Sequence, residues 1–130
     1  MLHPDAPQRV NKYSPQMKLI AILRNPVERA VSHYRMSTAN GMEPLSFKEA
    51  LIAEEERLKK PLNEGDSDSA WLWNSYKTRG LYAEQIDRWA RFFPADQILL
   101  INYHHFFKDP WQNIQPVYRF LGVAPYFWLR

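Results

Sequence analysis

The sequence has no cysteine, few glycines and no long hydrophobic run, and each absence excludes a class of protein or site. Without cysteine there are no disulfide frameworks, thiolate metal sites or cysteine nucleophiles. The longest wholly apolar stretch, Leu19 to Leu23, is far too short to span a membrane. The four glycines, at positions 41, 65, 80 and 122, are too scattered to form a glycine-rich phosphate loop.

Charge of one sign is also lacking, because 17 basic and 14 acidic side chains give a net charge of only +3. Both signs are interspersed, whereas nucleic-acid-binding domains usually concentrate basic side chains on one face. Aromatic residues make up 15% of the 130 residues, which argues against disorder and indicates one ordered domain or part of one. The N-terminal segment, with His3, Asp5 and several prolines, does not fit a signal peptide. We expect a cytoplasmic protein, unless a leader preceded a fragment.

Two apolar segments predict strands that are covered on both faces. These are Lys18 to Leu23 and Gln97 to Tyr103. Helical patterns lie between and after them, which is typical of an α/β fold with a parallel sheet and right-handed crossovers. Sheets usually hold about 4–6 strands, so two central strands indicate a fragment of a larger sheet. Exposed edges of such a sheet would favour self-association.

The first predicted helix directly follows the first strand. Asn25 is a suitable N-cap, Pro26 suits the first helical position, and Glu28 lies three residues after the cap. We expect this helix to reach about Ala39 and to end near Asn40.

Two more helices are predicted in the middle of the chain. A capping box at Ser46–Glu49 opens one that reaches about Lys60, with Glu54-Glu55-Glu56 on a solvated face. The other begins near Gly80 and ends at Pro94. Its buried stripe consists of Tyr82, Ile86, Trp89 and Phe93.

The last helix is predicted from Asp109-Pro110 to Gly122, and Pro116 within it predicts a kink or a later start. The other segments are predicted to be irregular: a proline-rich lead-in over residues 1–16, a loop over residues 62–74 and a tail over residues 124–130 that stops within an apolar run. We therefore interpret the chain as a single partial domain.

A candidate anion site lies where the first strand ends. Arg24 supplies a planar, permanently charged fork, and the following helix N-terminus would add free N–H groups and partial positive charge. Ser32, two turns into that helix, could add a hydroxyl donor. Together they would suit a terminal phosphate monoester. The alternative is that Arg24 pairs with an acid such as Glu28 and that Ser32 only covers the helix surface.

The segment from Leu23 to Tyr34, LRNPVERAVSHY, resembles the 3′-phosphate-binding segment of sulfotransferases that use 3′-phosphoadenosine 5′-phosphosulfate (PAPS). The resemblance continues in family order through further segments and covers residues 17–123. These segments are RGLYAEQIDRW, FPADQILL, FKDP and FLGV. The resemblance is strongest to the bacterial and carbohydrate-modifying branch of this family. It implies a P-loop-NTPase-like three-layer α/β fold with a parallel sheet, without the N-terminal phosphate-loop strand.

The resemblance also implies roles for particular residues. Arg24 and Ser32 would hold the 3′-phosphate of PAPS, and Tyr103, seven residues before Pro110, would contact the nucleotide. The alternative for Tyr103 is an aromatic residue that covers the core at a strand end. Other candidates have weaker assignments. His104 and His105 are expected to be solvated or hydrogen-bonded to a loop, His33 is expected to be a helix-face residue, and the aromatic residues either line an acceptor cleft or are buried under a loop. These aromatic residues are Trp71, Trp73 and Tyr76.

Parts of the family pattern have no counterpart in these residues: the phosphate loop with its lysine, the catalytic base, and the C-terminal basic-glycine loop. The implied function is that of a sulfotransferase fragment that holds the 3′-phosphate half of the nucleotide site, with no metal. In the complete enzyme a sulfuryl group would pass to an acceptor hydroxyl or amine. The alternatives are a non-catalytic nucleotide-binding or scaffold module of the same fold and a generic anion or nucleic-acid binder, the latter resting only on the net charge of +3. The sequence leaves the acceptor open between a carbohydrate, an acyl chain and a small phenol.

Overall fold

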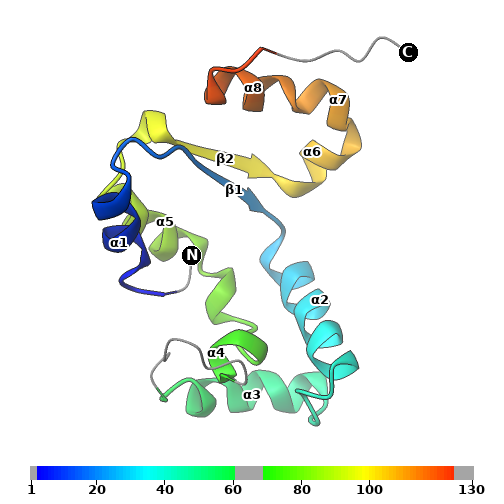
Figure 1. Cartoon of the computed structure of the whole chain (residues 1–130). Helices are drawn as coiled ribbons and strands as arrows, with labels where there is room; N and C mark the ends of the chain where they lie inside the picture. The colour runs from blue at the N-terminus through cyan, green and yellow to red at the C-terminus, as the bar shows by residue number, and fades with distance from the viewer. Residues whose placement is uncertain (1–2, 61–68, 125–130) are drawn as a thin grey trace. The chain divides into compact units, whose positions relative to one another are not determined.

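The computed structural model (Figure 1) describes residues 3–60 and 69–124. Its contacts divide it into two compact units. We call the described residues of the range 25–85, which group with His3, the helical unit. Residues 4–24 and 86–124 form the sheet unit. Within the residues that the structure describes, no helix is both long and apolar enough to cross a membrane.

The sheet unit is built on two parallel strands, β1 (Leu19–Leu23) and β2 (Ile98–Asn102). Leu19 pairs with Ile98, and the register runs without interruption to Leu23 opposite Asn102. The parallel α/β architecture predicted from the sequence is therefore confirmed. The carboxyl ends of both strands lie at the same edge, as the two arrowheads in Figure 1 show.

Neither strand is covered on both faces, so that prediction is wrong for the described chain. Ile22 is 48% exposed and Leu100 is 45% exposed, and no residue of either strand is fully buried. Their apolar character still explains why they are strands, because β-branched and leucine side chains suit a pleated, half-buried surface. A sheet of two strands with few helices against it lacks the area to bury both faces.

The proline-rich lead-in is also not irregular. Residues Ala6–Tyr13 form α1, with Pro7 in the first turn, where a missing N–H leaves no hydrogen bond unmade. Pro7 is buried, and the Asn11 side-chain amide donates to the Phe92 carbonyl at 2.9 Å. These contacts fix α1 within the sheet unit.

The C-terminal helices begin and end at the residues predicted from the sequence. Asp109 caps α7 (Pro110–Asn113) by accepting from the Gln112 N–H at 3.1 Å. A new helix, α8 (Gln115–Leu121), then begins with Pro116 in its first turn, which is the predicted later start. Gly122 ends α8 with a φ of +74°, a left-handed conformation that glycine adopts without steric cost. The predicted tail is described only at residue 124, because residues 125–130 lie outside the described residues.

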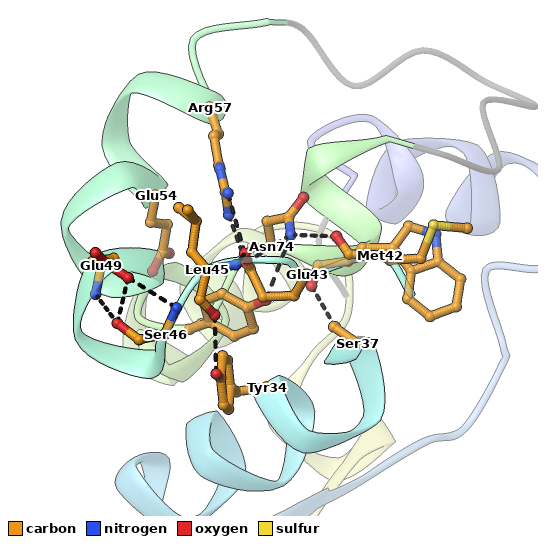
Figure 2. A network of polar contacts seen from close by, with 12 residues as sticks. Tyr34, Ser37, Met42, Glu43, Leu45, Ser46, Glu49, Glu54, Arg57 and Asn74 are labelled. Carbon is orange, nitrogen blue, oxygen red and sulfur yellow. Dashed lines mark hydrogen bonds and ion pairs between the residues drawn. The ribbon is translucent and has the colours of Figure 1, made fainter. Parts of the chain in front are cut away.

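In the helical unit, α2 (Pro26–Ala39) and α3 (Phe47–Arg57) begin at their predicted caps. Figure 2 shows the reciprocal capping box, in which Ser46 and Glu49 bond to each other. α3 ends at Arg57, one turn earlier than predicted. The predicted loop over residues 62–74 lies partly outside the described residues, and its last part forms the single-turn helix α4 (Ala70–Trp73).

Two elements complete the helical unit. They are the 3-10 turn η1 (Thr78–Gly80) and the start of α5 (Tyr82–Ala90), whose later residues belong to the sheet unit together with the turn η2 (Ala95–Gln97). The core of the helical unit consists of Ala30, Ala50 and Tyr76, with Tyr34, Leu45, Phe47 and Leu51 packed against it.

Candidate functional site

Arg24 and Tyr103 lie side by side where the two parallel strands end. Each follows a member of the last strand pair, Leu23 and Asn102, so the register itself brings them together. The Arg24 guanidinium carbon lies over the Tyr103 ring, 5.0 Å from its centroid. Carboxyl ends of parallel strands are where open α/β sheets bind ligands. Two of the three predicted site residues are thus adjacent.

The Tyr103 ring is held by its own helix. Tyr103 opens α6 (Tyr103–Lys108), which the sequence analysis did not predict, and the Asn102 side chain caps it by accepting from the His105 N–H at 3.0 Å. Phe107, one turn later, packs against Tyr103 with 4.7 Å between ring centroids. Asn102 at the strand end was the available signal for this helix. His104 and His105 are exposed, in agreement with their predicted solvated positions.

Ser32 lies on the exposed surface of α2, in the helical unit. Its convergence with Arg24 stays a prediction. The amide groups at the start of α2 differ from the expectation, because they are already engaged. The Asn25 side-chain oxygen accepts from the Val27 and Glu28 N–H groups at 3.0 and 3.3 Å, and Pro26 has no N–H. An anion there would gain the helix dipole but no free amide from these positions.

The donor set at the strand ends fits a phosphate. A guanidinium offers parallel N–H groups that match two phosphate oxygens and stays charged at all relevant pH values. Arg24 is partly buried rather than extended into solvent, and the aromatic face beside it limits its orientations. Among the described residues there is no cluster of three or more acidic or histidine side chains suited to a metal ion.

Glu43, in the segment between α2 and α3, is the centre of a buried polar network (Figure 2). It is 3% exposed and accepts from both Arg57 guanidinium nitrogens at 2.5 and 3.2 Å. It also accepts from the Tyr76 hydroxyl at 2.8 Å and from the Asn74 amide at 3.0 Å. Burial alone would raise the pKa of Glu43, but the hydrogen bonds from Arg57, Tyr76 and Leu45 outweigh it and lower that pKa. Glu43 was not predicted from the sequence as a site residue.

Glu54 departs from its predicted solvated position. It is 0% exposed and accepts from the Lys77 and Thr78 N–H groups at 2.7 and 2.8 Å, whereas Glu55 and Glu56 are exposed. Its spacing was the missed signal, because it lies four residues after buried Ala50 on one side of α3. Glu54 therefore ties the turn before α5 to α3.

Carbonyl groups at the end of α4 are captured by side chains from α2 and η1. Arg79 donates to the Trp71 and Leu72 carbonyls at 2.9 and 3.2 Å, and Ser37 donates to the Trp73 carbonyl at 2.6 Å. Helix ends leave such carbonyls unpaired, and cationic side chains suit them.

The His33 ring belongs to the same arrangement, since its Nε2 lies 3.0 Å from the Leu72 carbonyl. His33 is 7% exposed, and its buried Nδ1 has no partner among the described residues. Burial lowers the pKa of His33, and the nearby charges of Arg79 and Arg29 lower it further. A neutral ring that donates from Nε2 fits these contacts. The sequence predicted a helix-face residue at this position, and the structure shows that the His33 side chain is buried.

The three aromatic residues predicted as candidates for an acceptor cleft have different environments in the structure. Tyr76 is 0% exposed and belongs to the core, whereas Trp71 is partly exposed and lines an open cleft. Leu58, Lys77, Thr78 and Leu81 also line this cleft. Trp73 is partly buried and does not line it. Of the three, only Trp71 remains a candidate acceptor contact.

The sulfotransferase domain family matches residues 5–125. The chain belongs to this family. Among curated relatives, human heparan sulfate glucosamine 3-O-sulfotransferase 6 is 32% identical over 124 residues, which are 92% of this chain and 32% of that protein. Mouse bifunctional heparan sulfate N-deacetylase/N-sulfotransferase 3 is 30% identical over 130 residues, 95% of this chain and 14% of that protein.

The fold comparison agrees with the sequence comparison. A crystal structure of a sulfotransferase from Alicyclobacillus acidocaldarius matches with a TM-score of 0.81 and 36% identity, over 95% of this chain and 47% of that chain. The chain thus spans about a third of the length of the 3-O-sulfotransferase relative and about half of the solved sulfotransferase. The resemblance stated from the sequence is confirmed at the level of family and fold.

Proposed function

We propose that this sulfotransferase-family chain holds the 3′-phosphate of PAPS, with Arg24 as the main contact and Ser32 as a second donor. The observation that supports this most directly is the position of Arg24 at the carboxyl end of a parallel strand, packed on Tyr103. Because the amides at the start of α2 already donate to Asn25, the hydrogen bonds to the phosphate would have to come from side chains. The 3′-phosphate does not react, so these residues would contribute binding energy that orients the reacting sulfur.

We further propose that the complete enzyme transfers a sulfuryl group to a carbohydrate acceptor. An acceptor hydroxyl or amine would attack sulfur in line, lose its proton to a base, and release the nucleotide's 5′-phosphate oxygen as the S–O bond breaks. PAPS supplies the activated sulfuryl group when it is bound. Support for a carbohydrate comes from the relatives, whose names specify heparan sulfate.

Calorimetric titration of adenosine 3′,5′-bisphosphate into the purified chain tests the nucleotide role. Arg24→Ala should weaken binding by about 1.5–3 kcal/mol, the range for hydrogen bonds to a charged group, and Ser32→Ala by about 1 kcal/mol. Arg119→Ala, which removes an exposed arginine from α8 of the same unit, is the matched control and should leave the affinity unchanged. Equal affinities for the Arg24 and Arg119 variants would refute the assignment.

The alternative of a non-catalytic module predicts the same nucleotide binding without sulfuryl transfer. An assay with PAPS and heparan sulfate oligosaccharides therefore separates the two, provided that it uses the longest natural polypeptide that contains this chain. Sulfated product would support the enzyme. Tight nucleotide binding without product over a panel of carbohydrate, acyl and phenolic acceptors would favour the module.

A further inference from the structure

We infer that Tyr103 acts as a positioning residue, whose ring holds the Arg24 guanidinium in place for the phosphate. This inference rests on the proposed function and assigns Tyr103 a role different from the nucleotide contact that the family resemblance implies. The observation behind it is the 5.0 Å separation between the Arg24 guanidinium carbon and the Tyr103 ring centroid. A cation within about 6 Å of a ring face is attracted by the ring quadrupole.

The backbone itself places Arg24 and Tyr103 next to each other, whatever rotamers their side chains adopt. Leu23 and Asn102 are the last paired residues of β1 and β2, so the next residue of each strand is placed at the same edge. Parallel pairing sets the distance between the two Cα atoms independently of the side-chain rotamers. Arg24 and Tyr103 therefore start from neighbouring anchor points within one compact unit.

The ring itself is restrained from the side of its own helix. The Asn102 cap fixes the first turn of α6, and Phe107 packs against Tyr103 at 4.7 Å between centroids. A restrained ring is a useful platform, because a free arginine has many rotamers and loses that freedom when it binds a phosphate. Stacking beforehand removes part of this loss, which is the general benefit of preorganisation.

The two roles for Tyr103 make opposite predictions for its hydroxyl. If the ring face acts on Arg24, Tyr103→Phe retains the interaction and Tyr103→Leu removes it. If the hydroxyl contacts the nucleotide, both substitutions remove the contact. The ligand separates them as well, because a platform for Arg24 matters only when the ligand carries the 3′-phosphate that Arg24 binds.

The test is an NMR titration of the full chain with adenosine 3′,5′-bisphosphate and with adenosine 5′-phosphate. We expect Tyr103→Leu to weaken binding of the bisphosphate about three- to tenfold and to leave the monophosphate unchanged. Tyr103→Phe should bind both ligands within about twofold of the unsubstituted chain. Trp111→Leu, which removes an 85% exposed aromatic side chain from the same unit, is the control for loss of a ring.

A second measurement needs no ligand. Protons of the Arg24 side chain above the ring should resonate upfield of their ordinary positions, keep that shift in Tyr103→Phe and lose it in Tyr103→Leu. The phenylalanine variant retains the ring's packing on Phe107, so its result decides the matter even if the leucine variant does not fold.

Three results would overturn the inference while the proposed function stands: equal losses in both Tyr103 variants, a loss in Tyr103→Leu that is the same for both ligands, or no loss in Tyr103→Leu. A failure of the proposed function looks different, because Arg24→Ala would then leave the bisphosphate affinity unchanged. That result would overturn the inference together with the function on which it rests.

Discussion

Gly80 lies directly against Pro26, the first residue of α2. A Cβ atom at Gly80 would stand 3.0 Å from the Pro26 Cβ and 3.8 Å from its Cα. Real Cβ atoms rarely approach so closely, so the absence of a side chain at Gly80 lets the end of η1 pack on the start of α2. Arg29, one turn further along α2, donates to the carbonyl of Tyr76 and ties α2 to the chain just before η1.

Gly80→Ala should therefore destabilise the chain by about 1–3 kcal/mol, the usual cost of overpacking a close contact. Chemical denaturation measures this cost. A double-mutant cycle with Pro26→Gly supplies the control, because removal of the Pro26 side chain should relieve most of the penalty. If the two substitutions simply add, the close contact is not what requires glycine at position 80.

Glu43→Ala should cost about 3 kcal/mol of unfolding free energy. The substitution leaves the Arg57 guanidinium and the buried Tyr76 hydroxyl without their shared acceptor, and breaking buried pairs costs about 3–5 kcal/mol. We take the lower end because the Arg57 side chain is 24% exposed.

Glu56→Ala is the matched control for Glu43. It breaks the exposed pair with Lys59, whose side chains are 65% and 77% exposed, and such pairs contribute about 0–1 kcal/mol. Similar costs for the two glutamates would contradict the account of a buried network.

Stability should fall as pH drops through the ordinary titration range of histidine, because of His33. Burial and the charges of Arg79 and Arg29 lower its folded-state pKa below the unfolded value of 6.5. The unfolded chain then binds a proton at a higher pH than the folded chain, so the contribution of His33 is fully present above pH 6.5 and is lost below it. His33→Gln keeps a donor for the Leu72 carbonyl and should flatten this part of the profile. Thermal unfolding between pH 8 and pH 5 measures it, and identical slopes for both proteins would exclude His33 as the cause.

We propose that the chain self-associates through the exposed edges of its sheet, in which the strand residues Ile22 and Leu100 are 48% and 45% exposed. Ile22→Lys should shift the population toward monomer in light scattering or analytical ultracentrifugation. Ile52→Lys is the control, since Ile52 is 70% exposed on α3 of the helical unit. A monomeric unsubstituted chain at high concentration, or equal effects of the two lysines, would contradict this proposal.

Features set by short-range chemistry could be predicted from the sequence. Asn25, Ser46 and Asp109 cap their helices as predicted, and Gly122 ends the last helix, because each involves bonds between near neighbours. α1 was missed because its prolines suggested irregular structure, although Pro7 occupies the one turn that tolerates it. Capping residues therefore predict helix starts well. A proline, in contrast, can be interpreted only when its position in the helix is known.

Features set by tertiary packing could not be predicted. The burial of Glu54 depends on N–H groups 23 and 24 residues away, and the network around Glu43 joins segments that no local pattern connects. The candidate site is intermediate. Arg24 and Tyr103 were each chosen by motif, and their contact follows from the strand register, which only the structure supplies. The place of Ser32 in the site still rests on the motif alone.

The most direct test of the central claim compares two ligands that differ only in the 3′-phosphate. The unsubstituted chain should bind adenosine 3′,5′-bisphosphate at least about tenfold more tightly than adenosine 5′-phosphate, and Arg24→Ala should abolish this preference. Equal affinities of the unsubstituted chain for the two nucleotides, or a preference that survives in Arg24→Ala, would contradict the assignment of Arg24 to the 3′-phosphate.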